Sequence, residues 1–274
     1  MILPDGAAPD IPPPLPGEPP LAILVDYDGT VALTDVSDTI MAEHVPGIWE
    51  AEVAAYDAGR MGSRRLMELE VELIDAQPAA LLATAAEQPH DAGFVPFVRR
   101  AQAAGVPIEI VSDGFGFFIE PALVALGVGE LPVVTARTTF SGGRASIAFP
   151  NGHPTCLVCG TCKRNRVLAH QAAGRAVVFI GDGESDRYAA GYSDVVWAKR
   201  SLERICIEAG WAFQRWTGFH EIEAWLQATL ATWHADPSTL PTPRIHPFFC
   251  GPEAWGDGLV DPPADAWPPE RQAV

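Results

Sequence analysis

The sequence has no long hydrophobic run and few basic residues. Although 48% of its 274 residues are hydrophobic, its apolar runs, such as residues 21–25 and 176–180, are far shorter than the roughly 18 residues of a membrane-spanning helix. Lysine and arginine together number 18 against 35 aspartates and glutamates, which gives a formal net charge of −17. The few basic residues are scattered, so a phosphate backbone would be repelled. These absences exclude a transmembrane protein and argue against nucleic-acid and membrane partners.

The first twenty residues lack lysine, arginine and any apolar stretch, and therefore lack both parts of a secretory signal. Cysteine is scarce as well. There are five, an odd number, and three of them lie within residues 156–162, which is not the framework of a disulfide-rich secreted domain. We expect a cytoplasmic protein with reduced thiols.

Proline separates a folded body from the two ends of the chain. Of 26 prolines, eight lie in residues 1–20 and nine in residues 236–274. Because proline has no amide donor and restricts the residue before it, we expect residues 1–20 to form a tail and residues 236–274 an irregular extension. The extension contains aromatic residues that favour packing on the body or on a second subunit, which leaves a homodimer open: Phe248, Phe249, Trp255 and Trp267.

The body between these ends alternates short apolar runs with segments of helical period. The runs predict buried strands at residues 21–25, 107–111, 131–136, 176–180 and 194–198, and the segments predict helices at 94–104, 117–126, 163–173, 201–209 and 220–230. This alternation is typical of an α/β fold with a doubly wound parallel sheet. Residues 35–88 show only helical patterns and predict a small helical cap inserted after the first strand, so that residues 21–34 and 89–235 form the core. A hairpin is expected at residues 138–149.

Polar side chains follow several of the predicted strands. Asp26 and Asp28 come directly after the first strand, Ser112, Asp113 and Gly114 after the second, and Asp182 and Asp186 after the fourth; Lys163 begins a predicted helix. Each group alone also fits an ordinary turn or a solvated surface. Because ligands of open parallel sheets bind beyond the carboxyl ends of the strands, the groups together predict one shared site.

These four ordered motifs resemble those of the haloacid dehalogenase (HAD) superfamily, and the resemblance covers roughly residues 21–235. The position of the helical insertion is similar to that of the phosphoserine phosphatase-like branch. Residues 35–39 (DVSDT), 58–64 (AGRMGSR) and 111–115 (VSDGF) are similar to the bacterial 2-hydroxy-3-keto-5-methylthiopentenyl-1-phosphate phosphatase-like family. The resemblance implies a HAD-like Rossmannoid core and a phosphatase that acts on a small phosphate ester with Mg²⁺.

The resemblance also implies roles for the motif residues. Asp26 would be the nucleophile that forms an aspartyl-phosphate, and Asp28 would be the general acid and base. Ser112, Asp113 and Gly114 would bind substrate, and Lys163 would hold the transferred phosphoryl group. Mg²⁺ would be bound at Asp26, Asp182 and Asp186 and through the backbone carbonyl of Asp28, and Asp186 would orient Lys163 or a metal-bound water.

Three cysteines and a histidine precede Lys163 at regular intervals: His153, Cys156, Cys159 and Cys162. They supply four candidate ligands for a structural Zn²⁺. The spacing is tighter than in common zinc motifs, so reduced thiols without a metal remain the alternative.

Substrate choice is expected to lie in the cap. Arg60 and Arg64 are the candidate substrate-binding residues, with Arg65 as a third cation and Asp38 and Glu43 as candidate anions. Solvated helix faces with ion pairs at helical spacing are the alternative interpretation of all five.

Two other functions fit part of the pattern. In a phosphotransferase or mutase, the aspartyl-phosphate would pass to a second alcohol instead of water. A receiver-like signalling domain also carries an acidic cluster, a phospho-accepting aspartate and a lysine. Such a domain needs neither an acid two residues from the nucleophile nor a substrate cap, which disfavours it.

Overall fold

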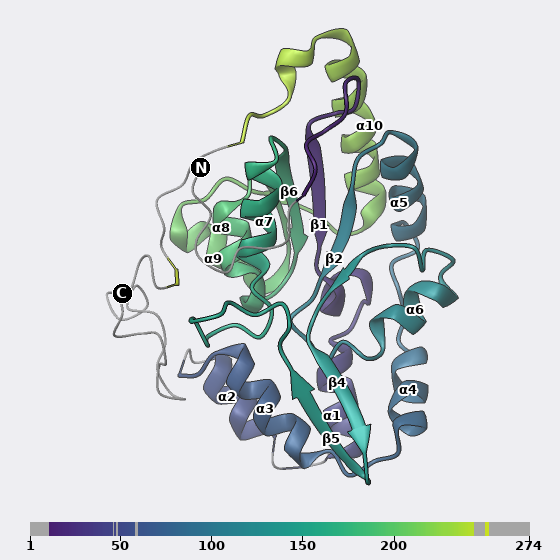
Figure 1. The fold of residues 1–274 in the computed structure, drawn as a ribbon, viewed down its shortest axis with the longest axis vertical. Helices are drawn as coiled ribbons and strands as arrows, with labels where there is room; N and C mark the ends of the chain where they lie inside the picture. Colours follow the sequence, from purple (N-terminus) through teal and green to yellow (C-terminus); the bar gives the residue numbers. More distant parts are fainter. Residues whose placement is uncertain (1–10, 46, 48, 58–59, 244–249, 252–274) are drawn as a thin grey trace.

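The computed structural model describes residues 11–45, 47, 49–57, 60–243 and 250–251. Its centre is a six-stranded sheet in the order β3-β2-β1-β6-β7-β8, in which all neighbours are parallel. The strands are β1 (Leu21–Val25), β2 (Ile108–Val111), β3 (Val133–Val134), β6 (Ala176–Gly181), β7 (Val195–Ala198) and β8 (Gln214–Arg215). Figure 1 shows helices on both faces of this sheet. The predicted α/β class and parallel sheet are confirmed.

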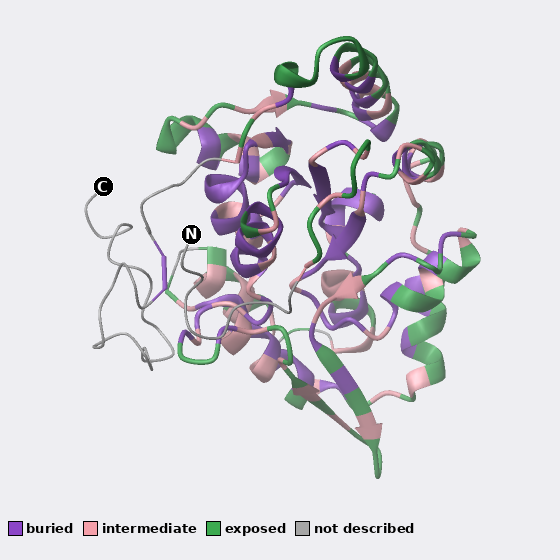
Figure 2. Cartoon of the chain, turned by 45° about the horizontal axis from the view of Figure 1, so that its top comes forward, coloured by how far each residue is buried: buried purple, intermediate pink, exposed green. Residues whose placement is uncertain are grey.

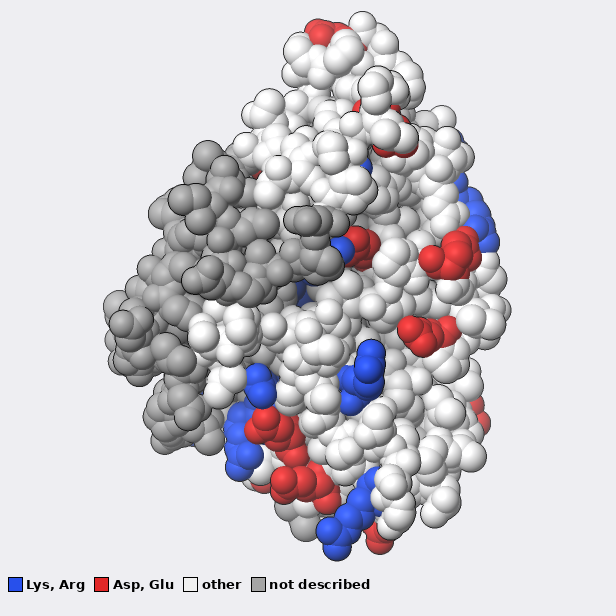
Figure 3. All heavy atoms as spheres, viewed as in Figure 1, with Lys and Arg blue, Asp and Glu red and all other residues white. Residues whose placement is uncertain are grey.

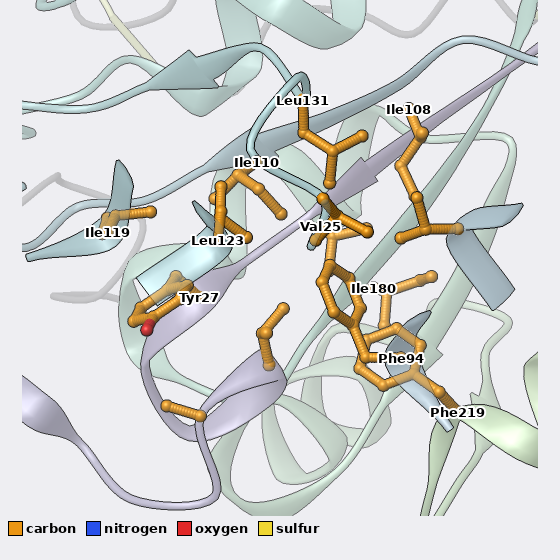
Figure 4. Packing of buried hydrophobic residues seen from close by; sticks show 14 of the residues in the cluster. Val25, Tyr27, Phe94, Ile108, Ile110, Ile119, Leu123, Leu131, Ile180 and Phe219 are labelled. Atoms are coloured by element: carbon orange, nitrogen blue, oxygen red, sulfur yellow. The ribbon is translucent and has the colours of Figure 1, made fainter. Parts of the chain in front are cut away.

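The strands are buried because their side chains are apolar on both faces. Every residue of β1 and of β6 is buried, and Ile23 of β1 lies opposite Ile108 of β2 and Val178 of β6. One face packs on α5 (Phe94–Ala103), α6 (Ile119–Ala125) and α10 (Phe219–Ala235), where Phe94 and Phe219 meet edge to face (Figure 4). The other packs on α7 (Lys163–Ala172), α8 (Arg187–Tyr192) and α9 (Arg200–Ala209). Figure 2 shows these buried strands surrounded by helices with exposed outer faces.

Residues 35–88 form the expected helices after β1. These are α1 (Val36–His44), α2 (Glu50–Asp57), α3 (Ser63–Leu73) and α4 (Pro78–Ala86). The predicted hairpin, β4 (Arg137–Ser141) and β5 (Arg144–Ala148), packs along α3, and the Arg64 guanidinium lies 4.8 Å from the centre of the Phe149 ring. In Figure 1 the helices and the hairpin lie together at one end of the molecule. The hairpin is therefore joined to the helical insertion.

The edges of the sheet differ from the prediction. The strand expected at residues 131–136 is reduced to Val133–Val134, and the sixth strand, Gln214–Arg215, was not predicted. A two-residue edge strand carries no readable period, because one side chain lies on each face. Helix α8 was missed for a similar reason, since six residues are too few to show a helical period.

The described parts of both ends contact the body. The carbonyl of Pro12 accepts a hydrogen bond from Arg175, and that of Pro20 accepts one from Ala176 N–H at 2.9 Å. The carbonyl of Cys250 accepts one from Arg164 at 2.7 Å, within the buried layer. Residues 1–10 and the four aromatic residues of the extension lie outside the described residues. In the part of the chain that the structure describes, no helix is both long and apolar enough to cross a membrane.

Candidate active site

A cavity of about 240 Å³ lies between the carboxyl ends of the strands and helices α1, α2 and α3. Asp26 and Asp28 reach it from the end of β1, Ser112 and Gly114 from the end of β2, and Asp182 from the loop after β6. The parallel sheet brings these separated segments to one edge, as the sequence predicted.

Lys163 joins the first and last acidic motifs beneath the cavity. Its ammonium donates hydrogen bonds to Asp26 Oδ1 at 2.6 Å and to Asp186 Oδ1 at 2.6 Å, and all three residues are buried. The two carboxylates raise the pKa of Lys163 and outweigh the opposing effect of burial. Burial, with repulsion from Asp186, raises the pKa of Asp26 well above its ordinary value, although Lys163 opposes this. The charged ammonium thus fixes the Asp26 carboxylate at the floor of the cavity.

Asp28 is held by the first turn of the following helix. Its Oδ1 accepts a hydrogen bond from Val36 N–H at 2.9 Å, and Gly29, with φ +68°, turns the chain between them. Burial, followed by repulsion from Asp35 and Asp26, raises the pKa of Asp28 well above its ordinary value. A carboxyl group with a raised pKa holds its proton more readily, which suits a general acid.

Ser112 and Gly114 border open space beside Asp28. Ser112 is fully buried, and its Oγ has no hydrogen-bond partner among the described residues. A Cβ on Gly114 would come within 2.6 Å of Asp28 Oδ2, so only glycine leaves this space free. An orphaned hydroxyl beside such a space fits an anionic oxygen.

Asp113 is engaged with the protein itself. Its carboxylate accepts hydrogen bonds from the Ser63 hydroxyl of α3 and from Thr161 N–H, the latter at 2.8 Å. Burial raises the pKa of Asp113. Although Asp113 borders the cavity, its contacts tie the cap helix to the loop before Lys163.

Arg200 was not predicted as a site residue. Its Nη1 lies 3.0 Å from Asp182 Oδ2 and it borders the cavity. Its φ of +51° is uncommon for a residue other than glycine, and such strain is often found at functional sites. Burial and repulsion from Asp186 raise the pKa of Asp182 to about 6, and Arg200 partly offsets this. The only sequence signal was a basic pair, Lys199 and Arg200, after the fifth strand.

The acidic residues fit a divalent cation. Asp26, Asp182 and Asp186 each place one buried oxygen within 4.8 Å of the others, the only such group of three ligands in the described part of the chain. Carboxylate oxygens are the ligands that Mg²⁺ prefers. Both carboxylate oxygens of Asp186 already accept hydrogen bonds. Its Oδ1 accepts one from Lys163, and its Oδ2 accepts one from Asp182 N–H at 2.9 Å and one from Gly183 N–H at 3.0 Å.

The arginines of the cap do not border the cavity. Arg60 is exposed, while Arg64 and Arg65 lie 3.3 Å and 3.5 Å from the carboxylate of Glu68. Among the candidate anions, Asp38 borders the cavity and the exposed Glu43 does not. The structure thus brings one of these five residues to the cavity. On the face shown in Figure 3, Lys and Arg are interspersed with Asp and Glu and form no continuous basic area.

The cysteines of the predicted zinc motif border a second, smaller cavity of about 20 Å³ behind Lys163, together with Cys250 of the extension. All five cysteines of the chain are described and none forms a disulfide. Burial raises the pKa of the Cys159 and Cys162 thiols. His153 Nδ1 accepts a hydrogen bond from Cys156 N–H at 3.0 Å. No three of these sulfur and nitrogen atoms lie within 4.8 Å of one another in the described chain.

An aspartate pair, a buried lysine and a second acidic motif at the strand ends are typical of a hydrolase of the phosphoryl-transfer class. A family model confirms this class, since residues 23–191 match the haloacid dehalogenase-like hydrolases. The chain belongs to this family.

Curated relatives and solved structures agree with this assignment. The chain is 29% identical over 235 residues to the 2-hydroxy-3-keto-5-methylthiopentenyl-1-phosphate phosphatase of Lysinibacillus sphaericus. The matched region covers 79% of this chain and 98% of that protein. It is 26% identical to the enzyme of that name from Brevibacillus brevis, over 76% of this chain and 95% of the relative. Its fold is similar to that of a phosphoserine phosphatase with a phospho-aspartyl intermediate analogue, with a TM-score of 0.58 and 15% identity over 75% of this chain and 98% of that one. The sequence-based prediction of a HAD-type phosphatase is confirmed.

Proposed function

We propose that the protein is a magnesium-dependent phosphomonoesterase that hydrolyses a small phosphate ester through an aspartyl-phosphate on Asp26. The observation that carries this proposal is the placement of the Asp26 carboxylate. It is fixed by Lys163 at the floor of a cavity, beside two further acidic residues, and Asp28 lies two residues further along the chain. Helices α1–α4 form the cap of this proposal, and the remaining described body forms the core.

The metal would be held by Asp26, Asp182 and Asp186, with the backbone carbonyl of Asp28 as a further oxygen ligand. When bound, the cation neutralises the repulsion between a carboxylate and an anionic phosphoryl group.

The residues of the chain then divide the reaction into two displacements. An Asp26 oxygen attacks phosphorus, the bond from phosphorus to the ester oxygen breaks, and Asp28 gives its proton to the departing alkoxide. Asp28 next takes a proton from water, whose oxygen attacks phosphorus and frees Asp26 as inorganic phosphate leaves. Ser112 and Lys163 hold the transferred oxygens in both steps.

Phosphate release from a panel of esters tests this proposal, with Mg²⁺ and again with a chelator. The panel includes p-nitrophenyl phosphate and the ester in the relatives' name. We expect release that requires Mg²⁺ and no added acceptor alcohol, with a loss of at least about 10³-fold in Asp26→Asn, which removes the nucleophile but keeps its shape. Release only with an added alcohol would indicate a phosphotransferase. A phospho-enzyme that persists for minutes would indicate a receiver-like domain.

Zinc remains a separate prediction from the sequence. The small cavity is large enough for one ion or water, and Cys250 supplies a fourth thiol if His153 keeps its backbone contacts. The ligand atoms would have to move inward to bind one ion. Elemental analysis of the purified protein tests this prediction. If Cys250→Ser loses zinc that the wild type holds, Cys250 of the extension is one of the ligands. The cytoplasmic location expected from the sequence stays a proposal.

A further inference from the structure

The cap side of the active-site cavity carries carboxylates where a phosphatase for an anionic leaving group would need cations. Asp35 and Asp38 reach the cavity from α1 and its N-cap, Asp57 from α2, and Glu70 from α3. Among the described residues that border the cavity, the only lysine or arginine is Arg200, and it lies on the core side with Asp182.

Glu70 is the most informative of these carboxylates. It is only 3% exposed, and its Oε1 has no hydrogen-bond partner among the described residues. Burial, with Asp38, Asp35 and Glu52 nearby, raises its pKa to about 9. The charged form is costly to bury without a partner, so the free protein keeps this carboxyl group protonated at neutral pH, and a cation bound beside it would lower its pKa and ionise it. Such groups occur mainly at functional sites.

The rest of the wall suits an organic cation. Tyr56 supplies an aromatic ring to the wall, and Val53, Leu66 and Met67 supply apolar side chains. A tyrosine ring attracts an ammonium group, and apolar side chains pack on its carbon substituents. A second bare metal ion fits less well, because the cap carboxylates do not bring three ligands within 4.8 Å of one another in the described chain.

We propose that the substrate is a phosphate ester whose leaving group carries a positive charge, a primary or quaternary ammonium, and that Glu70 with Asp38 recognises this charge. This inference rests on the proposed phosphomonoesterase function and specifies its substrate class. The phosphoryl group lies over Asp26, and the carbon skeleton extends along Tyr56 and Met67. Asp35 is partly committed to the protein, because its carboxylate accepts a hydrogen bond from Asp38 N–H at 2.9 Å.

Three esters of similar size test the charge preference in the presence of Mg²⁺: 2-aminoethyl phosphate, propyl phosphate and 2-carboxyethyl phosphate. We expect kcat/KM to be highest for the amine and at least about 10-fold lower for the neutral ester, since a charged contact in a desolvated pocket is worth about that factor. The carboxylate ester should be the poorest substrate.

Glu70→Gln isolates the proposed contact, because it removes the group that ionises beside a bound ammonium and keeps its shape. The ratio of kcat/KM between the amine and the neutral ester should fall close to one, because the amine loses a contact that propyl phosphate does not make. Comparing this ratio between variants cancels differences in leaving-group reactivity. Glu72→Gln on the exposed side of the same helix is the matched control and should keep the wild-type ratio.

An unchanged ratio in Glu70→Gln, or a wild-type preference for the neutral or the anionic ester, overturns the inference. So does a loss of bound Mg²⁺ in Glu70→Gln, because the cap would then hold a second ion. Each of these outcomes leaves the proposed function intact if p-nitrophenyl phosphate is still hydrolysed with Mg²⁺ and Asp26. Failure to hydrolyse any ester would reject the proposed function and the inference with it.

Discussion

The buried carboxyl groups on the two sides of the active-site cavity differ in their hydrogen-bond partners. On the core side, Asp186 accepts hydrogen bonds from Lys163 and from the N–H groups of Asp182 and Gly183, at distances of 2.6 to 3.0 Å. On the cap side, Glu70 is equally buried, yet its Oε1 has no partner among the described residues and its charged neighbours are acidic. The Asp186 carboxylate is therefore paired within the folded protein, whereas Glu70 would gain a counter-charge from a bound ligand.

This difference assigns catalysis to the core side of the cavity and substrate selection to the cap side. A network whose donors and acceptors are all paired is rigid, and rigidity is what the positioning of a nucleophile requires. Unpaired carboxylates weaken the folded state and leave binding energy for a ligand that neutralises them. Substitutions on the core side should therefore lower turnover for every ester, whereas those on the cap side should change preference and stability.

Asp28→Asn should produce the largest effect among variants that test this comparison. Asparagine keeps the contact with Val36 N–H but cannot donate the carboxyl proton, so kcat for alkyl phosphates should fall by roughly 10³-fold. The loss should be much smaller for p-nitrophenyl phosphate, whose leaving group needs little protonation. Steady-state kcat values for both esters check this prediction. Equal losses would contradict the acid role.

Lys163→Ala should lower kcat about 100-fold for all esters and weaken inhibition by inorganic phosphate, because it removes a preorganised cation worth about 2 to 4 kcal/mol. It also leaves Asp26 and Asp186 without their shared ammonium, so the melting temperature should fall. Kinetics should be measured well below that temperature. A loss confined to amine esters would place Lys163 with the cap and remove the contrast between the two sides.

The residues on the core side were predictable from the sequence, because their positions follow from where the strands end. Apolar strands that end in Asp26, Ser112 and Asp182 must release these residues at one edge of a parallel sheet, whatever the details of packing. The helix that begins at Lys163 starts at the same edge, and the structure brings its ammonium to Asp26. The edge strands were less predictable, because two paired residues leave no periodic signal.

The cap side was not predictable in this way. Which faces of α2 and α3 meet the cavity depends on tertiary packing, so Arg64 and Glu70, six residues apart on one helix, could not be separated by sequence alone. Arg200 depends on a strained backbone at the start of α9, which residue type does not reveal. Cys250 reaches the cysteine cavity across a long sequence separation that carries no local pattern.

Glu70→Gln should stabilise the protein at high pH. The pKa of this carboxyl is about 9 in the folded protein against an ordinary 4.5, because it is buried beside Asp38, Asp35 and Glu52. Between these values only the unfolded chain releases the proton, so wild-type stability falls as pH rises, by up to about 1.4 kcal/mol per unit. Glutamine has no proton to lose. Over this range the difference grows to about 6 kcal/mol at most, so at about 2 to 4 °C per kcal/mol the melting temperature of the variant should exceed that of the wild type by about 10 °C or more near pH 9 and by little near pH 4.5.

Thermal unfolding from pH 4.5 to 9, without metal or substrate, checks this prediction. Glu72→Gln should show no pH-dependent difference from the wild type. A difference for Glu70→Gln that is constant or that falls with pH would mean that Glu70 has a partner in solution, and the cap side would then resemble the core side.

Arg64→Ala should have the smallest effect and sharpens the comparison from the cap side. The Arg64 guanidinium lies 3.3 Å from Glu68 and 4.8 Å from the centre of the Phe149 ring, away from the cavity. Partly exposed contacts of this kind contribute about 1 kcal/mol or less to stability, so the melting temperature should fall by only a few degrees and kcat/KM should change by less than about twofold for amine and neutral esters alike. A tenfold loss for every ester at an unchanged melting temperature would place the guanidinium on the substrate. The cap would then contribute a cation after all, and the preference for a positively charged leaving group would lose its physical basis.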